Sequence, residues 1–316
     1  MKYELAIVGG GPAGVSAGIY AARKKIKTIL IAESFGGQSL TSLDIQNWIG
    51  TKSVTGLDLA KMLEEHLRAQ EGIDIKEGAR VESIQKSGDG FKLALKNNEV
   101  IETKYLLLAN GSHRKKLGVP GERELDGRGV AYCSTCDAPV FAGKTIAIVG
   151  GGNSALEGVR DSLPYASKIY LIARGDHLRG DPISQEKAKN SDKVEIIYNA
   201  EIQEILGDLP AQAGKMVTGL KYKDKKGGEI KALKLDGVFV EIGSVPNSDL
   251  AKEMPGIKLN NYSEIIVDHK TQVAAPGVWA AGDVADVLYK QNNISAGDAV
   301  KAVLNIYDTL HSVKRI

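Results

Sequence analysis

The chain alternates between short runs in which every residue is apolar and longer stretches in which apolar residues recur at helical spacing. Residues 5–8 form one such run, followed by a glycine cluster, an alanine-rich stretch over 15–23 and a second candidate buried strand over 27–31, which is apolar from Ile29 onward. A short, uninterrupted apolar run is typical of a parallel strand that is buried on both faces. This order predicts a strand–helix–strand unit with the glycines at its first turn.

The pattern then changes before the middle of the chain. Leucines recur every fourth residue within 57–70, which predicts an amphipathic helix. Short alternating runs with glycine and asparagine turn signals fill 80–103 and predict a small antiparallel meander. An apolar run over 105–109 predicts a return to a buried strand.

The same plan recurs later, with an offset of 141 residues between the two glycine clusters. Mainly apolar segments over 144–149 and 168–172 predict two further strands. Alternating segments fill 194–235 and predict a second meander, and a buried strand is expected over 237–240. This repetition predicts an α/β fold with two Rossmann-like nucleotide-binding domains, each carrying a small antiparallel β-meander.

The composition is that of an ordinary globular protein. A length of 316 residues suggests about two domains at ~150 residues each. The net charge of +2 is too small to argue for nucleic acid or an anionic membrane as a partner. No apolar run reaches the ~18 residues of a membrane helix, and the first residues lack the long apolar core of a secretory signal. We therefore expect a cytoplasmic protein.

The first glycine cluster is a complete G-x-G-x-x-G. It follows a predicted strand and precedes a predicted helix, and Glu33 lies 24 residues beyond Gly9. Glycines at these positions let the backbone approach a pyrophosphate at a helix N-terminus, and the acid can bind ribose hydroxyls. The alternative is a glycine-rich turn without a ligand. The candidate residues of this first nucleotide site are Gly9, Gly11, Pro12, Ala13, Gly14 and Glu33.

The second glycine cluster is a G-x-G-x-x-A, and the residue that follows it at the same spacing is a cation. Arg174 lies 24 residues beyond Gly150, and Arg179 follows five residues later. Cations there suit the 2′-phosphate of NADP(H), which we expect over NAD(H); the alternative is two solvated surface arginines. The candidate residues of this second site are Gly150, Gly152, Asn153, Ser154, Ala155, Arg174 and Arg179.

The only two cysteines, Cys133 and Cys136, form a C-x-x-C pair. Such a pair can depress the pKa of one thiol, and the thiolate is the form that attacks disulfides. A structural zinc site would need further ligands, and no second cysteine pair or histidine cluster is present, so we expect no metal. A structural disulfide is disfavoured in a reducing compartment. A redox-active dithiol is the favoured interpretation.

The closing segment joins a predicted strand over 277–283 to a predicted helix over 294–309. Gly282 and Asp283 lie at the strand end, where an acid suits contact with a flavin's ribityl chain or phosphates. A solvent-facing loop aspartate is the alternative.

Taken together, these motifs resemble the low-molecular-weight thioredoxin reductases, which are FAD-dependent pyridine nucleotide-disulfide oxidoreductases. The segments that carry the resemblance are 9–14, 36–38, 45–48, 117–121, 133–137, 150–155 and 280–284. The resemblance implies a discontinuous FAD domain over 1–114 and 245–316, with an NAD(P)H domain over 115–244 inserted in it. It also places five residues against FAD, namely Gly37, Gln38, Asn47, Asp283 and Gln291.

The activity that the resemblance implies is a relay from NADPH through FAD to the Cys133–Cys136 disulfide, and on to a thioredoxin- or glutaredoxin-like protein. Cys136 would face the flavin, Cys133 would attack the partner, and Asp137 would act as general acid and base. Family members are homodimers that rotate one domain on the other, with hinges corresponding to 113–117 and 243–247.

The chain departs from the family pattern at the nucleotide site. The family has His-Arg-Arg and a later arginine where this chain has only Arg174 and Arg179. NADH, ferredoxin or another flavin source therefore stays open as the electron donor. Two further alternatives are a dithiol oxidase that passes electrons to oxygen and a flavin-binding redox sensor that uses the C-x-x-C as a switch.

Overall fold

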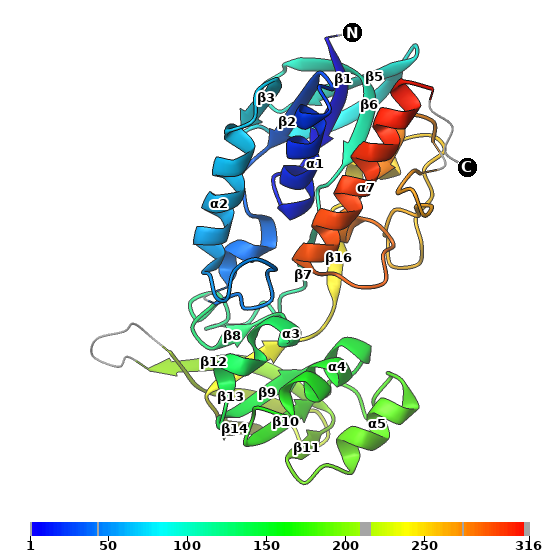
Figure 1. The fold of residues 1–316 in the computed structure, drawn as a ribbon. Coiled ribbons are helices and arrows are strands. Elements are labelled where there is room, and N and C mark those ends of the chain that lie inside the picture. Colours follow the sequence, from blue (N-terminus) through cyan, green and yellow to red (C-terminus); the bar gives the residue numbers. More distant parts are fainter. Residues whose placement is uncertain (1, 43, 209–215, 274, 313–316) are drawn as a thin grey trace. The chain divides into compact units, whose positions relative to one another are not determined.

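The computed structural model describes residues 2–42, 44–208, 216–273 and 275–312 (Figure 1). Its contacts divide the chain into two compact units. The first comprises Met1–Leu40, Trp48–His113 and Val245–Ile316, and the second comprises Thr41–Asn47 and Arg114–Ser244. The short segment Thr41–Asn47 therefore groups with the second unit, although the sequence assigned it to the first domain.

The first unit contains a parallel sheet that continues into an antiparallel meander. Strands β3, β2, β1 and β6 run parallel in that order, β17 also pairs with β6, and β6, β5 and β4 form the meander. The strands are β1 (Tyr3–Val8), β2 (Thr28–Ala32), β3 (Ile73–Glu77), β4 (Val81–Ser87), β5 (Gly90–Leu95), β6 (Val100–Leu108) and β17 (Val278–Ala280).

One strand, β6, belongs to both parts of this sheet. Its first half pairs antiparallel with β5 from Val100 to Thr103, and its second half pairs parallel with β1 as far as Leu108. The sequence suggested a meander strand followed by a separate buried strand. The two are continuous because no glycine or proline interrupts the run, and Thr103 at the junction is fully buried.

Small residues set the helix packing of the first unit. Helix α1 (Pro12–Arg23) contacts α2 (Gly56–Arg68) on one side and α7 (Asn292–Leu310) on the other (Figure 1). A Cβ built on Gly18 would lie 2.6 Å from Leu67 Cδ1, so only glycine allows α1 and α2 to approach this closely. The remaining short helices of the unit are η1 (Gly37–Thr41), α6 (Asp249–Lys252) and η3 (Gly282–Val284).

The second unit repeats the plan with a parallel sheet in the order β11-β10-β9-β15-β8 and a separate antiparallel meander, β12-β13-β14. The strands of the parallel sheet are β8 (Val130–Ala131), β9 (Thr145–Val149), β10 (Lys168–Ile172), β11 (Val194–Ile197) and β15 (Gly237–Val240). The meander strands are β12 (Ala200–Asp208), β13 (Met216–Asp224) and β14 (Ile230–Lys234), and the helices are α3 (Ser134–Asp137), η2 (Ala138–Phe141), α4 (Asn153–Ser162) and α5 (Pro182–Lys189).

The prediction of a meander from residue 194 onward was wrong at its start. Strand β11 pairs parallel with β10, with Ile169 opposite Val194, and so extends the Rossmann-like sheet. Helix α5 was not predicted either, although Asp181 caps it by accepting a hydrogen bond from the Ser184 amide at 2.8 Å and Pro182 opens its first turn.

The predicted α/β fold with two Rossmann-like sheets and two small meanders is confirmed. The chain passes between the units at β7 (Ser112–Arg114) and β16 (Ser244–Pro246), which pair with each other. Among the described helices, none combines the length and the apolar character that crossing a membrane requires.

Candidate redox and nucleotide-binding sites

The glycines of the first loop have two different structural roles. A Cβ on Gly9, where φ is +124°, would collide with the Ala109 carbonyl oxygen, and one on Gly14 would collide with the carbonyl oxygen of Gly9. These glycines are required by backbone packing. At Gly11, by contrast, the nearest atom that a Cβ would meet is the Gly37 Cα at 4.0 Å. Gly11 thus leaves an open backbone surface for a ligand.

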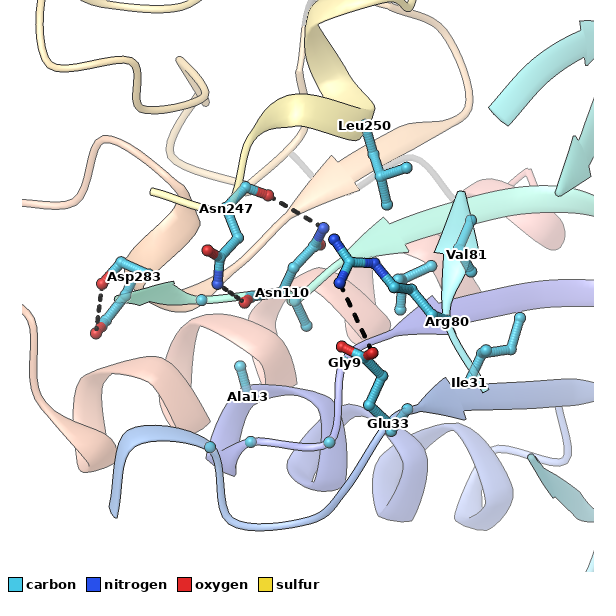
Figure 2. Close-up of a pocket in the computed structure, with 18 of the residues that line it drawn as sticks. Gly9, Ala13, Ile31, Glu33, Arg80, Val81, Asn110, Asn247, Leu250 and Asp283 are labelled. Carbon is cyan, nitrogen blue, oxygen red and sulfur yellow. Dashed lines mark hydrogen bonds and ion pairs between the residues drawn. The ribbon is translucent and has the colours of Figure 1, made fainter. Parts of the chain in front are cut away.

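This open surface borders a cavity of about 840 Å³ in the first unit. The cavity is lined by the glycine loop, the end of β2, the residues before and in the start of β4, the segment after β6, and Asp283 (Figure 2). Glu33 lies at its edge and forms an ion pair with Arg80 at 3.8 Å, with both side chains 64% exposed. The volume is within the range of cofactor sites in proteins, roughly 300–1,000 Å³.

An unsatisfied acceptor belongs to a residue that lines this cavity. Asn110 donates its side-chain amide to the Asn247 carbonyl oxygen at 3.2 Å, and Asn247 donates back to the Asn110 carbonyl at 2.8 Å (Figure 2). The Asn110 Oδ1 is buried and has no hydrogen-bond partner among the described residues. Buried acceptors are normally paired, and this unpaired one lies on a residue of the cavity lining. The sequence did not point to Arg80 or Asn247, because neither belongs to a local motif.

Asp283 and the preceding Gly282 join the closing segment to Gln38 and to the glycine loop. It accepts hydrogen bonds from Gln38 at 3.2 Å and from the Ser295 hydroxyl at 3.2 Å. A Cβ on Gly282 would lie 3.1 Å from the Ala13 Cβ. The predicted flavin contacts at Gly37, Gln38 and Asp283 all line the cavity, as do Gly9, Gly11, Pro12, Ala13 and Glu33.

Two other predicted flavin contacts do not line this cavity. Gln291 is the N-cap residue of α7, and Asn47 groups with the second unit. Gly14 and Gly282 are buried beside the cavity lining, where they serve packing.

The second glycine loop has the same division of roles. A Cβ on Gly150 would collide with the Glu241 carbonyl oxygen, whereas one on Gly152 would meet no atom within 4 Å. The loop that follows β10 folds back onto it, because the Arg179 amide donates to the Gly151 carbonyl at 2.7 Å. The side-chain oxygen of Asn153 accepts a hydrogen bond from the Asp181 amide at 2.7 Å. Ser154 and the buried Ala155 lie in the first turn of α4.

The two predicted phosphate-binding arginines differ in their surroundings. Arg179 is exposed and held beside the glycine loop by its own backbone amide. Arg174 lies two residues beyond the end of β10, its side chain is 80% exposed, and its Nε lies 4.0 Å from a carboxylate oxygen of Glu201 on β12. A carboxylate at that distance weakens the attraction of Arg174 for a phosphate.

The two cysteines are joined in the second unit. Cys133 and Cys136 form a disulfide with a Cα–Cα distance of 5.3 Å, and both residues are half-buried. The amides of Cys136 and Asp137 both donate to the Cys133 carbonyl, at 3.2 and 3.0 Å, which closes the turn of α3. On the outer side of this turn, the Thr135 hydroxyl donates to Asp161 on α4 at 2.7 Å.

Two carboxyl groups with raised pKa values adjoin this turn. Burial, assisted by the charge of Glu241, raises the pKa of Asp137 to about 7, against opposing contributions from the Ser42 hydrogen bond and the Arg114 charge. Burial also raises the pKa of Glu241 to about 7, although Arg114 and the hydrogen bonds from Ser134 oppose the shift. Both groups can therefore gain or lose a proton near neutral pH.

Glu241 was not among the residues that the sequence suggested. It follows the last residue of β15, and its Oε1 accepts a hydrogen bond from the Ser134 amide at 3.0 Å. The available signal was an acid at the end of an otherwise apolar run, next to a predicted glycine loop. Within the described part of the chain, no three His, Cys, Asp or Glu side chains gather as a metal site would need.

Comparison with known proteins agrees with this geometry. The sequence matches the family described as Pyridine nucleotide-disulphide oxidoreductase over residues 3–302. The solved thioredoxin reductase from Streptococcus pyogenes MGAS5005 is similar to this chain with a TM-score of 0.90 and 30% identity, covering 98% of both chains. The thioredoxin reductase from Giardia duodenalis is similar with a TM-score of 0.89 and 31% identity, covering 98% of this chain and 99% of that one.

Among curated relatives, a subunit of alkyl hydroperoxide reductase from Xanthomonas campestris pv. phaseoli is 41% identical over 310 residues, which are 98% of this chain and 57% of the relative. NADH dehydrogenase of Bacillus subtilis (strain 168) is 39% identical over 308 residues, which are 98% of this chain and 58% of the relative. The chain thus spans less than three fifths of the length of these relatives. Its two glycine loops, its cysteine pair and these matches together show that the chain is an oxidoreductase of the pyridine nucleotide-disulphide oxidoreductase family.

Proposed function

We propose that this protein is a flavin-dependent disulfide reductase that delivers electrons from NADPH, through the Cys133–Cys136 disulfide, to a thioredoxin- or glutaredoxin-like protein. The observation that carries the proposal is the disulfide in a turn flanked by two carboxyl groups that titrate near neutral pH. The likeness to thioredoxin reductases supports a disulfide-bearing protein as acceptor. The relatives named as alkyl hydroperoxide reductase subunits support the same class of chemistry.

FAD would be held in the first unit and the nicotinamide nucleotide in the second. Gly11 offers its backbone to the pyrophosphate, Glu33 offers a carboxylate to ribose hydroxyls, and Asn110 offers its buried acceptor. FAD, when bound, supplies hydride acceptance from the nicotinamide and transfer of the electron pair to the disulfide. We further propose that the protein functions as a homodimer, as the resemblance to this class implies.

Asp137 is proposed as the proton-transfer group of the dithiol. Reduction breaks the S–S bond with two electrons, and the sulfur that becomes a thiol needs a proton. Cys133 as thiolate then attacks the partner disulfide, and the mixed disulfide is resolved by Cys136, which loses its proton in that step. A carboxyl group with a pKa of about 7 can give and take that proton at neutral pH.

The second candidate donor is NADH, and a specific contact favours it. Glu201 lies 4.0 Å from Arg174 and would repel a 2′-phosphate placed there. The Bacillus subtilis relative is named NADH dehydrogenase, which also favours NADH. Arg179, which lies beside the glycine loop, favours NADPH.

The relay is tested by Cys136→Ser in the flavin-loaded protein. We expect the variant to bind FAD normally and to lose reduction of a thioredoxin-like acceptor, because no disulfide forms to accept the electron pair. Retained turnover in the variant would rule out the dithiol relay. Rapid oxygen consumption with small dithiols by the unmodified protein would instead indicate an oxidase, and no turnover with any donor and acceptor would indicate a sensor.

The donor is tested by anaerobic bleaching of the bound flavin with NADPH and, separately, with NADH. Faster bleaching by NADPH at micromolar concentration is expected if Arg174 and Arg179 contact the 2′-phosphate. A preference for NADH would make them surface charges. Bleaching by neither would mean that another donor reduces the flavin.

A further inference from the structure

Glu241 occupies a backbone position that has an equivalent in the first unit, where the residue is Ala109. In the first unit the Ala109 amide donates to the Val8 carbonyl at 2.9 Å, and in the second the Glu241 amide donates to the Val149 carbonyl at 2.9 Å. The carbonyl of each residue lies against the first glycine of its loop, Gly9 or Gly150, where a Cβ would collide with it. The two backbones are therefore equivalent, and the position holds a methyl group in one unit and a carboxyl group in the other.

The carboxyl group at this position contacts the turn that carries the disulfide, residues 133–137, which we call the redox turn. Glu241 is only 6% exposed, and its carboxylate accepts a hydrogen bond from the Ser134 amide at 3.0 Å. Ser134 directly follows Cys133, so the carboxyl group is hydrogen-bonded to the disulfide-bearing turn itself. Helix α4 packs against this contact, because a Cβ on Gly158 would lie 3.5 Å, an ordinary contact distance, from both Glu241 Cγ and Ser134 Oγ.

Charged groups face Glu241 from three elements. Arg114 on β7 is a cation whose charge lowers the pKa values of both Glu241 and Asp137. Asp137 on α3 and Glu157 on α4 are acids, and the charge of Glu157 raises the pKa of Glu241. One arginine thus faces two buried acids, and a thiolate formed at the same turn would add a further negative charge.

We propose that Glu241 is a positioning and proton-holding residue of the redox turn, which takes up a proton when the Cys133–Cys136 disulfide is reduced. The inference deepens the proposed function and rests on a redox-active disulfide. It assigns no direct contact between Glu241 and the partner protein.

Reduction of the disulfide in this step consumes two electrons and two protons. The oxidised site holds the disulfide and the Glu241 carboxylate. Two electrons, supplied by the reduced flavin in turnover or by an added dithiol in the test, break the S–S bond. One proton binds to one sulfur, a second binds to Glu241, and the other sulfur remains a thiolate. The charge near Arg114 is then unchanged, because a thiolate has replaced a carboxylate, and the attacking thiolate persists without a third negative charge.

The test counts protons. Anaerobic holoprotein is reduced with dithiothreitol at pH 8 in weakly buffered solution, and the protons taken up or released per disulfide are measured with an indicator dye. In Glu241→Gln, which keeps an acceptor for the Ser134 amide, we expect the net proton uptake to fall by about one proton per disulfide, because the carboxylate that binds the second proton is missing.

Asp161→Asn is the matched control. Asp161 also accepts a hydrogen bond from the redox turn, through Thr135, but it does so on the outer side and beside Arg160. Its proton uptake is expected to equal that of the unmodified protein. Equal proton uptake in Glu241→Gln and in the unmodified protein would overturn the proposal.

A second measurement remains available if Glu241→Gln does not fold. The infrared difference spectrum of reduction at pH 7, recorded on the unmodified protein and on Asp137→Asn, should gain protonated-carboxyl signal in both. The absence of a gain in Asp137→Asn would overturn the proposal. Both measurements use chemical reduction without a nucleotide or a protein acceptor. Failure of the proposed function would show as absent turnover, whereas failure of this inference would show as unchanged proton uptake in Glu241→Gln.

Discussion

The two glycine loops of this protein share a backbone and differ in the charges placed around it. In each loop the first glycine packs against a carbonyl oxygen and the third position of the motif is open to a ligand. The first unit then carries Glu33 paired with Arg80, and the second carries Arg174 paired with Glu201. In both units the second member of the ion pair, Arg80 or Glu201, comes from the beginning of the meander. Both units therefore have an ion pair here, but the acid and the cation have exchanged places.

The comparison extends to the residue beneath each loop. Ala109 in the first unit and Glu241 in the second make the same backbone contacts. Backbone hydrogen bonds and glycine packing define the scaffold, and they tolerate either side chain at that position. The difference in chemistry between two copies of one plan therefore lies in a few side chains that the scaffold does not constrain.

The largest expected effect comes from a methyl group on a packed glycine. Gly9→Ala should destabilise the first unit by more than about 3 kcal/mol and abolish flavin binding, because the new Cβ collides with the Ala109 carbonyl and φ is +124°. Urea unfolding and the visible absorbance of the purified protein measure both effects.

Gly152→Ala is the matched change in the other loop, where no atom lies within 4 Å of the new Cβ. It should change the free energy of unfolding by less than about 0.5 kcal/mol, which is typical of a change that meets no packed neighbour. Any loss should be confined to the KM of the nucleotide. A flavin-loaded Gly9→Ala of normal stability would break the proposed division of roles.

An intermediate effect is expected from the reversed charge pair. Arg174→Ala should lower kcat/KM for NADPH by about 10–100-fold and leave that for NADH unchanged, because a charge-assisted hydrogen bond contributes roughly 1.5–3 kcal/mol. Arg80→Ala, which removes the cation of the pair in the first unit, should leave both values unchanged in the flavin-loaded protein. Equal losses with the two nucleotides would mean that Arg174 does not distinguish the 2′-phosphate.

The smallest expected effect is a pH dependence of stability. The pKa of Glu241 is raised from 4.5 to about 7 in the folded protein, so the folded state binds more protons than the unfolded state between these values. Stability is therefore highest below pH 4.5 as far as this group is concerned, and it is lost as pH rises, by about 1 kcal/mol between pH 6 and 7.

Glu241→Gln should flatten this part of the profile of the free energy of unfolding against pH, measured by urea titration. Asp161→Asn serves as its control, because Asp161 contacts the same turn through Thr135 and its replacement leaves the buried carboxyl group in place. A profile that stays equally steep in Glu241→Gln would show that the proton is bound elsewhere.

The sequence predicted those parts of the molecule whose environment is encoded locally. Uninterrupted apolar runs became buried parallel strands, as at 5–8 and 146–149, because a strand covered on both faces has no polar side. Glycines at fixed spacing marked both loops. The C-x-x-C pair indicated its own closure, because residues three apart in a turn are within disulfide reach.

The sequence alone was insufficient where the outcome depends on distant neighbours. Strand β11 was placed in the meander because the residues of Val194–Ile197 do not specify whether they pair with the strand before or after them. The mutual hydrogen bonds of Asn110 and Asn247 join residues 137 positions apart. No local pattern marks such a pair.

By itself, then, the sequence determined two Rossmann-like sheets, two glycine loops and one dithiol, since each depends on side-chain periodicity or on the conformational freedom of glycine over a few residues. Only the tertiary structure decided which charges face these loops and which acid lies behind the disulfide. The pKa values of Asp137 and Glu241 are raised by burial, and burial is a property of the packed elements around a carboxyl group, not of the residues beside it in the chain.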